Sequence, residues 1–438
     1  MMPKRPTAAL WGQPKMVALL LLGFSSGLPL YLASRTLQAW MTVEKVDLTT
    51  IGLFSLVALP YSLKFLWAPV VDRYVPPFLG RRRGWMVIIQ LALLAVIAAM
   101  ALQDPTRSLK LLAVNAIVIA FLSASQDIVV DAYKIDVLSE REMGVGAAIS
   151  VVGYRVALLT TGSLAFLLAD RMPWPMVYLA MSALMLIGVV AALRAPEPVL
   201  HQRPPATFAD AVVLPFREFF QRAGTMTGVL VLVFITVFKL PDYMAGTMAT
   251  PFLLSTGFTQ TDIGAIQGGL GLASTIVGAL AGGSVVARIG INRSIWVFGV
   301  LQALSNLAYY GLALVGKSYP FLVGTMLIEN FCTGLVTAGF IAFLMSMCDV
   351  RFSATQYALL SSLMGASRDV LVAPAGAIAQ HTGWPTYFLI TLIAAIPGMA
   401  LLPIFAPWNR RSPLNAAPHS GDTASGEPTR RPDGSTPA

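Results

Sequence analysis

The sequence predicts an all-α integral membrane protein with about twelve transmembrane helices in two halves of six. Three observations lead to this prediction. Hydrophobic residues make up 56% of the 438-residue chain and charged residues only 12%, about half the charged share of an ordinary soluble protein. Long apolar runs recur along the chain at lengths near the ~20 residues that cross a bilayer. Short stretches of the first half also recur in the second half.

The apolar runs divide evenly between the two halves. They lie near residues 16–34, 50–71, 85–103, 110–131, 145–168 and 174–193, and again near 225–249, 262–287, 294–316, 319–347, 355–379 and 384–405. Each run has about the length that a membrane-spanning helix needs. We therefore predict an N-terminal six-helix bundle over residues 1–194 and a C-terminal six-helix bundle over residues 224–408.

An internal repeat supports the two halves. The stretch AWMTVEKVDLTTIG before the second span has a counterpart in FLLSTGFTQTDIG before the eighth, and APVVDR at 68–73 matches GSVVAR at 283–288. Repeats of this kind are common in transporters. Between the halves, residues 195–223 are basic, contain proline and are partly amphipathic, which predicts a cytoplasmic linker suited to the membrane surface. Residues 409–438 are rich in Pro, Ser and Gly and are predicted to form a disordered cytoplasmic tail.

The distribution of positive charge predicts the orientation. Of the 30 Lys and Arg residues, 20 fall on one side of the predicted membrane and six on the other. By the positive-inside rule, both termini are expected in the cytoplasm. The net charge of +9 is spread over short loops and tails rather than gathered on a basic face, so nucleic acid is not an expected partner.

Catalytic and metal-binding patterns are weak. The three histidines, at positions 201, 381 and 419, lie outside the predicted spans and far apart, which supports neither a catalytic triad nor a zinc site. GLALVGKS at 311–318 satisfies the phosphate-loop pattern but ends an apolar span with no preceding strand. GFSSG at 23–27 lies within a helical span rather than a strand-to-helix turn. We expect no enzyme, no metal and no cofactor other than a proton gradient.

Ionisable residues within the spans are the strongest functional signal. A charged side chain at the membrane centre costs at least about 2.5–3.5 kcal/mol. The third, sixth, ninth and twelfth spans contain none, which predicts that the remaining spans surround a polar cavity. The alternative is a set of ion pairs that only stabilises the bundle; it is equally plausible for adjacent Arg368 and Asp369 and for Lys239 and Asp242. The ionisable residues within the predicted spans are Lys64, Asp127, Arg155, Lys239, Asp242, Glu329, Arg368 and Asp369.

Several long strings carry a family resemblance. In the first half they are residues 23–44, LKFLWAPVVDRY at 63–74, GRRRGW at 80–85 and SASQDIVVDAYKIDVL at 123–138; in the second half they are 238–253, 329–348 and FSATQYALLSSL at 352–363. Here the sequence resembles the AmpG-type muropeptide permeases of the major facilitator superfamily. The resemblance covers nearly all twelve spans. In the major facilitator fold the third helix of each triplet is peripheral, as the charge pattern also indicates.

The resemblance implies a function as well as a fold. It implies a multi-pass protein of the bacterial inner membrane that imports peptidoglycan turnover fragments, the N-acetylglucosaminyl-1,6-anhydro-N-acetylmuramyl peptides, from periplasm to cytoplasm. Such uptake is proton-driven and belongs to cell-wall recycling and β-lactamase induction. The expected partners are the anhydromuropeptide, protons and the lipid bilayer, with no obligate protein partner.

The residues suggest roles that fit this substrate. Cations bind peptide carboxylates, and amides bind sugar hydroxyls and amides. The predicted substrate ligands are Lys64, Gln126, Arg155, Lys239, Asn330 and Arg368. A proton-coupling site needs a carboxylate whose surroundings change between states. Asp127 is the first candidate and Glu329 the second, because neither has a cation within four residues on its own helix; Asp242 and Asp369 have one.

The charged loop after the second predicted span resembles a known gate motif. Asp72 and Arg73, followed by the arginines at 81–83, resemble the loop motif of the superfamily and predict a cytoplasmic gate. Ala287 replaces the corresponding acid in the second half, so the gate is expected to be asymmetric.

Three other functions are alternatives to muropeptide import. They are a facilitator for another anionic solute such as acetyl-coenzyme A, a membrane enzyme acting on lipid-linked wall precursors, and a receptor that binds without transporting.

Overall fold

Apolar helices of membrane-spanning length make up most of the molecule. The structure is a computed structural model and describes residues 11–46, 54–198 and 207–408. No strand occurs within these ranges. Ten helices, some of them joined through π-helical turns, are long and apolar enough to cross a membrane. They coincide with every predicted span except the second and the eleventh.

The first half contains the elements up to the predicted linker. They are α2 (Pro14–Tyr31), η1 (Leu32–Thr36), α3 (Leu37–Val43), η2 (Phe54–Ala58), α5 (Leu59–Leu63), η3 (Lys64–Leu66), α6 (Ala68–Arg73), α7 (Arg81–Met100), α8 (Leu109–Val137), α9 (Met143–Leu159), η4 (Thr160–Leu164), α10 (Ala165–Ala169) and α11 (Trp174–Arg194).

The second half follows helix α12 (Phe208–Ala223). Its elements are α13 (Thr225–Phe238), α14 (Leu240–Ser255), α15 (Gln260–Ile263), η5 (Gly264–Gly271), α16 (Leu272–Ile289), α17 (Ile291–Val315), α18 (Tyr319–Ser346), η6 (Val350–Phe352), α19 (Ser353–Ala366), η7 (Ser367–Leu371), α20 (Ala375–Thr382) and α21 (Trp384–Phe405).

The second and eleventh predicted spans are broken into short helices. Along 54–73 the backbone passes through η2, α5, η3 and α6, and along 353–382 it passes through α19, η7 and α20. Prolines at 60, 69 and 374 lie at these breaks, where their missing N–H groups interrupt the helical ladder. Irregular backbone at membrane depth is tolerated where it is enclosed by protein or lines a polar cavity. Both breaks carry predicted functional charges, Lys64 and Arg368.

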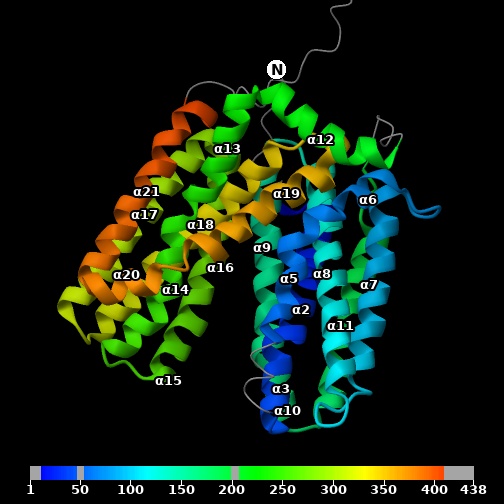
Figure 1. Cartoon of the computed structure of the whole chain (residues 1–438), viewed down its shortest axis with the longest axis horizontal. Helices are drawn as coiled ribbons and strands as arrows, with labels where there is room; N and C mark the ends of the chain where they lie inside the picture. The colour runs from blue at the N-terminus through cyan, green and yellow to red at the C-terminus, as the bar shows by residue number, and fades with distance from the viewer. Residues whose placement is uncertain (1–10, 47–53, 199–206, 409–438) are drawn as a thin grey trace, which may run out of the picture.

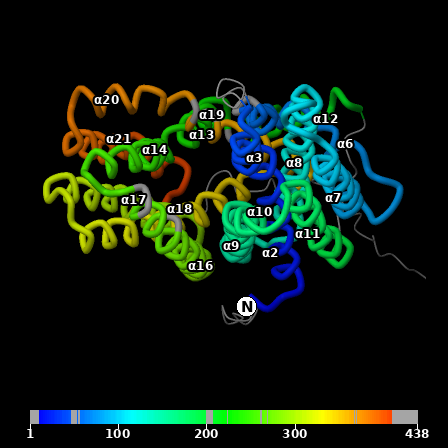
Figure 2. The backbone as a smooth tube through the Cα atoms, turned by 90° about the horizontal axis from the view of Figure 1, so that it is seen from below, coloured from blue at the N-terminus to red at the C-terminus, as the bar shows by residue number. Residues whose placement is uncertain are grey.

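The two halves stand side by side and converge toward one end. Figure 1 shows them meeting near α12 and diverging toward α3, α10 and α15, and Figure 2 shows the two groups of helices from below. We call these the α12 end and the α15 end. A methyl group on Gly144 of α9 would lie 2.4 Å from the Val286 side chain of α16, and one on Gly283 would lie 2.7 Å from the Gly144 carbonyl oxygen. Only glycine permits this crossing.

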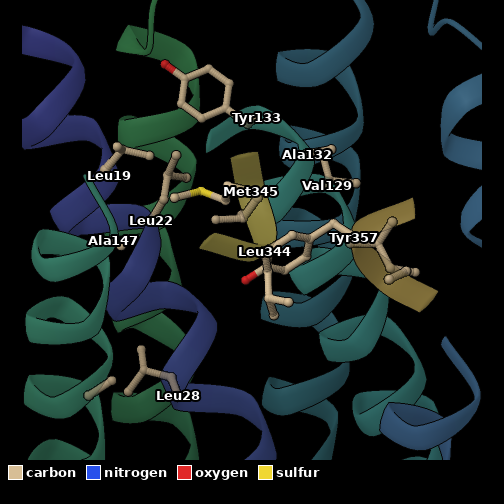
Figure 3. Packing of buried hydrophobic residues seen from close by; sticks show 14 of the residues in the cluster. Leu19, Leu22, Leu28, Val129, Ala132, Tyr133, Ala147, Leu344, Met345 and Tyr357 are labelled. Atoms are coloured by element: carbon tan, nitrogen blue, oxygen red, sulfur yellow. The ribbon is translucent and has the colours of Figure 1, made fainter. Parts of the chain in front are cut away.

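A hydrophobic core continues across the two halves at the α12 end. Figure 3 shows Leu344 and Met345 of α18 and Tyr357 of α19 beside Leu22 of α2 and Val129 of α8. All five are at most 4% exposed. The helices of the two halves therefore pack together at this end as closely as the helices of one soluble domain.

Helix α12 corresponds to the amphipathic part of the predicted linker. Thr207 accepts a hydrogen bond from the Asp210 backbone nitrogen (3.0 Å), and Asp210 accepts one from the Thr207 nitrogen (3.1 Å), so a capping box begins the helix. The helix packs on α6 of the first half and on α13 and α19 of the second. Residues 199–206 of the predicted linker and the predicted tail 409–438 lie outside the described residues.

Candidate transport site and gate

A buried carboxylate joins the two halves at the α12 end. Asp72, at the end of α6, is fully buried. It accepts hydrogen bonds from Arg81 (2.7 Å) and from the backbone nitrogen and hydroxyl of Thr355 (both 2.8 Å). Thr355 lies in the first turn of α19, whose unpaired N–H groups and dipole favour a negative charge. Asp72 of the first half thus caps a helix of the second.

Arg82 extends this contact into a network. Its fully buried guanidinium donates to Asp136 (2.5 Å), Ser353 (2.7 Å) and Asp72 (3.2 Å). The Ser353 hydroxyl donates to Asp136 (2.7 Å). Charge-assisted hydrogen bonds of this kind are strong, and a buried charge without them would be costly. We refer to Asp72, Arg81, Arg82, Asp136, Ser353 and Thr355 as the gate network.

Two details differ from the sequence expectation. Asp136 belongs to α8, which extends beyond the predicted span 110–131, so the sequence did not mark it as part of the gate. Arg73 lies with its guanidinium 5.5 Å from the centre of the Tyr74 ring. No hydrogen bond or ion pair from Arg73 to the other half occurs among the described residues.

A second set of charges surrounds the broken span of the first half. Lys64 of η3 lies 3.8 Å from Asp131 of α8, and Lys134 lies 2.5 Å from the same carboxylate. Lys134 also lies 6.0 Å from the ring centre of Tyr357 in the second half. Asp127, one turn before Asp131, is within electrostatic range of both lysines. Asp127 has no cation within four residues on α8, but Lys64 of the neighbouring broken span lies within its electrostatic range.

Two of the predicted cations, one from each half, act on the same tyrosine. Arg155 of α9 and Arg368 of η7 both lie within electrostatic range of the Tyr154 hydroxyl, as does Asp127. Arg155 is partly buried and the Arg368 side chain is exposed. Arg155 makes no hydrogen bond or ion pair within the described ranges. The pair is therefore the most accessible positive charge among the predicted ligands and is shared by both halves.

In the second half the predicted charges are enclosed. Lys239, at the break between α13 and α14, forms an ion pair with Asp242. Both side chains are 8% exposed, so in this structure the pair takes the ion-paired arrangement that was the alternative to a substrate-binding Lys239. Glu329 of α18 accepts a hydrogen bond from Thr333 (3.1 Å) and is 8% exposed. It lies within electrostatic range of Lys239 and Asp242.

The predicted amide ligands are engaged in packing. Gln126 of α8 is fully buried and donates to Ser25 of α2 (2.9 Å). Asn330 of α18 donates to the Met326 carbonyl oxygen (2.8 Å) and accepts from Thr275 of α16 (3.2 Å). The side chain of Asp369 lies outside the described residues.

Several polar residues near the arginine pair were not predicted. Tyr61 of α5 hydrogen-bonds with Ser123 of α8 and is within electrostatic range of Asp127 and Tyr154. Arg35 of η1 lies 5.6 Å from the centre of the Tyr31 ring. These tyrosines are hard to recognise in a sequence, because an isolated aromatic residue in an apolar span usually marks packing.

Comparison with known proteins decides the family. A family model described as Major Facilitator Superfamily matches residues 16–368. The chain belongs to the major facilitator superfamily. As a major facilitator protein it is a transporter rather than an enzyme, and the predicted fold class is confirmed.

Its relatives within the superfamily are closely similar. The chain is 47% identical over 392 residues to the anhydromuropeptide permease of Escherichia coli (strain K12), covering 89% of this chain and 79% of the relative. It is 31% identical over 398 residues to the putative transporter AmpG 4 of Rickettsia felis, covering 89% and 95%. The predicted resemblance to the AmpG-type permeases is confirmed.

Solved major facilitator structures share the fold. The human organic anion transporter MFSD10 aligns with a TM-score of 0.65 at 16% identity, covering 91% of this chain and all of that chain. The proton:xylose symporter XylE aligns with a TM-score of 0.68 at 9% identity, covering 90% and 95%. At these identities the likeness concerns the fold alone.

Proposed function

We propose that this protein imports N-acetylglucosaminyl-1,6-anhydro-N-acetylmuramyl peptides across the bacterial inner membrane. The observation that supports this most is that Arg155 and Arg368, from opposite halves, both lie within electrostatic range of the Tyr154 hydroxyl. Peptide carboxylates form charge-assisted hydrogen bonds with guanidinium groups. A substrate that holds both arginines would couple its own binding to the relative position of the halves. The 47% identity to a protein named anhydromuropeptide permease supports an anhydromuropeptide as the substrate that carries this carboxylate.

The charge distribution supports an orientation of the protein in the membrane. The α12 end carries the start of α2, the linker helix and the arginine-rich start of α7. These elements belong to the side of the membrane to which the sequence assigns 20 of the 30 Lys and Arg residues. We place this end in the cytoplasm, by the positive-inside rule. The halves then meet on the cytoplasmic side and diverge on the periplasmic side, as expected of a conformation that receives substrate from the periplasm.

Proton coupling completes the proposal. Import against a gradient needs a group that binds a proton in one state and releases it in the other. Asp127 and Glu329 are the candidates, because each is a carboxylate at membrane depth within electrostatic range of a buried lysine of its own half. In Asp127→Asn and Glu329→Gln variants, loss of pH-driven accumulation with retained exchange would identify the coupling residue. Full pH-driven accumulation in both variants would reject this assignment.

The test of the substrate is counterflow in proteoliposomes. Vesicles containing the purified protein and loaded with unlabelled anhydromuropeptide should take up the labelled compound without any gradient. Acetyl-coenzyme A, the substrate of the competing proposal, should neither exchange nor compete. Exchange of acetyl-coenzyme A without exchange of the muropeptide would reverse the assignment, and saturable binding without exchange would indicate a receptor.

A further inference from the structure

Two buried amides in the second half have no hydrogen-bond partner. Gln302 and Asn306 of α17 are 5% and 0% exposed. In the part of the chain that the structure describes, neither the nitrogen nor the oxygen of either amide is hydrogen-bonded. The two residues are one helical turn apart and share a face of α17. Buried polar groups are almost always satisfied by protein or by internal water.

A small cavity adjoins this face. It has a volume of about 10 Å³ and is lined by Gly299 and Gln302 of α17, Asp242 of α14, Val336 of α18 and Met399 of α21. That volume is close to the ~10–15 Å³ needed to accommodate one water molecule. The amide and the carboxylate supply the polar partners that distinguish a hydrated cavity from a dry apolar one.

The first half treats its buried amides differently. Gln90 of α7 and Gln126 of α8 both donate to the Ser25 hydroxyl, at 3.3 and 2.9 Å. Their nitrogens are therefore satisfied by protein, and only their side-chain oxygens have no hydrogen-bond partner among the described residues. The hydroxyl of Ser305, which lies between Gln302 and Asn306 in the sequence, donates to the Gln302 backbone carbonyl (2.8 Å) instead. The side-chain amides of α17 are left for another partner.

The amide pair lies beside the predicted coupling carboxylate. Helices α17 and α18 run antiparallel, with Thr325 donating to the Ala308 carbonyl (3.3 Å) and Gly339 packed against Phe298. This register puts Glu329 at the level of Asn306. The titratable groups that face the region are Lys239 and Asp242 from the α13–α14 break, Glu329 and Cys332 from α18, and Tyr309 from α17.

We propose that Gln302 and Asn306 bind internal water molecules that relay protons between Glu329 and the Asp242 side of the second half. The inference rests on the proton coupling proposed above. In each transfer one O–H bond of a water breaks as its proton passes to the next acceptor. A new O–H bond forms on the same water from its donor, so atoms and charge balance. The transported proton comes from bulk water on one face and returns to bulk water on the other.

The first test measures hydration in the wild-type protein. A density map at a resolution that shows waters should contain at least one within hydrogen-bond distance of the Gln302 or Asn306 amide. Direct bonding of both amides to protein atoms, with no water beside them, would overturn the proposal. This result does not depend on transport.

The second test measures the relay. Gln302→Leu and Asn306→Leu, alone and combined, remove the water ligands while keeping side-chain volume. We expect wild-type counterflow but pH-driven accumulation slowed by about tenfold or more, as when a proton-transfer group is lost. Ser305→Ala is the matched control, because its hydroxyl already donates within the helix, and it should accumulate substrate normally.

The outcomes separate this proposal from the proposed function. Normal pH-driven accumulation in the double variant overturns the relay and leaves the transporter assignment intact. Wild-type protein that exchanges substrate but never responds to a pH gradient overturns proton coupling and the relay together. If the leucine variants fail to fold, Gln302→Asn and Asn306→Gln, which keep an uncharged amide as a water ligand, should fold and accumulate substrate. Failure of accumulation in these variants when folded contradicts the relay.

Discussion

Asp72 and Arg82 are fully buried charges whose partners come from both halves. Removing one partner of a buried ion pair strongly destabilises the protein, because an uncompensated charge remains buried. Replacing both partners by apolar residues of similar volume has a much smaller effect on stability. The gate network is therefore strong only while the halves are together, and it must be exchanged for water when the α12 end opens. This makes single residues of the network determinants of the conformational equilibrium.

The first prediction concerns this equilibrium. Asp72→Asn removes the charge that holds Arg81 and the start of α19, and should weaken closure of the α12 end by about 3–5 kcal/mol. Spin-label distances between the halves at that end should shift toward longer values. Arg73→Gln is the matched control, since the neighbouring guanidinium packs on Tyr74. Equal distance distributions in Asp72→Asn and wild type would show that the network does not hold the gate.

The second prediction concerns substrate binding. Arg155→Gln or Arg368→Gln removes a charged donor and should cost about 1.5–3 kcal/mol of binding energy, which is roughly tenfold or more in the Kd for anhydromuropeptide. Titration calorimetry on the purified protein measures this directly. Arg194→Gln, at the exposed end of α11, should bind normally. Unchanged affinity in both variants would mean that the arginines only stabilise the bundle.

At the scale of elements, the breaks in the helices determine where charge is tolerated. Lys64, Lys239 and Arg368 each lie in or beside an interruption, where backbone groups already need polar surroundings. At the α9–α16 crossing the helices are continuous instead of broken, and glycines allow their backbones to touch. Both features serve a molecule whose halves meet firmly at one end and separate at the other.

The third prediction concerns the crossing. Gly283→Val places a side chain where even a methyl group would meet the Gly144 carbonyl oxygen at 2.7 Å, so the α12 end should fail to close. Cysteine cross-linking between α9 and α16 at that end should fall. Gly162→Val is the control, because nothing lies within 4 Å of a methyl group there. Efficient cross-linking in Gly283→Val would contradict the tight packing.

The fourth prediction concerns pH. Glu142, in the loop between α8 and α9, is partly desolvated by burial, but hydrogen bonds from Lys15 (2.6 Å) and Ser139 (2.7 Å) outweigh this and hold its pKa below the usual 4.5. Its stabilising contribution is therefore complete above that value and disappears as pH falls through the lower folded pKa. Glu142→Gln should lower the Tm at pH 7, and the difference from wild type should vanish toward pH 3. A difference that persists there would reject the ionic explanation.

The sequence was sufficient for ten of the twelve spans and for placing Lys239 and Asp242 within reach of each other, because length, hydropathy and i, i+3 spacing are local properties. It could not predict that Lys64 faces Asp131, or that Gln126 is enclosed against Ser25, because these contacts join helices far apart in the chain. It also missed Asp136, since α8 continues past its apolar stretch. The breaks at Lys64 and Arg368 could have been suspected from the nearby prolines.

At the scale of the whole molecule, the proposed import requires the halves to move against each other around Arg155 and Arg368. Helix α12 touches both halves at the α12 end, and Gln356 of α19 donates to Glu218 of α12 (2.7 Å), so the linker takes part in the closed arrangement. Binding energy from a substrate that holds Arg155 and Arg368 together would favour closure of the α15 end. Alternating access then requires that the free energy of closing the α15 end around the substrate be similar to that of closing the α12 end through the gate network.

The most direct test follows both ends at once when substrate binds. Spin labels at exposed Leu102 and Leu314 report the α15 end, and labels at exposed Tyr74 and Val350 report the α12 end. With saturating anhydromuropeptide in a lipid environment, the first distance should shorten, and a population with a longer second distance should appear. If substrate binds but both distance distributions stay unchanged, the protein does not import this compound by alternating access around the arginine pair.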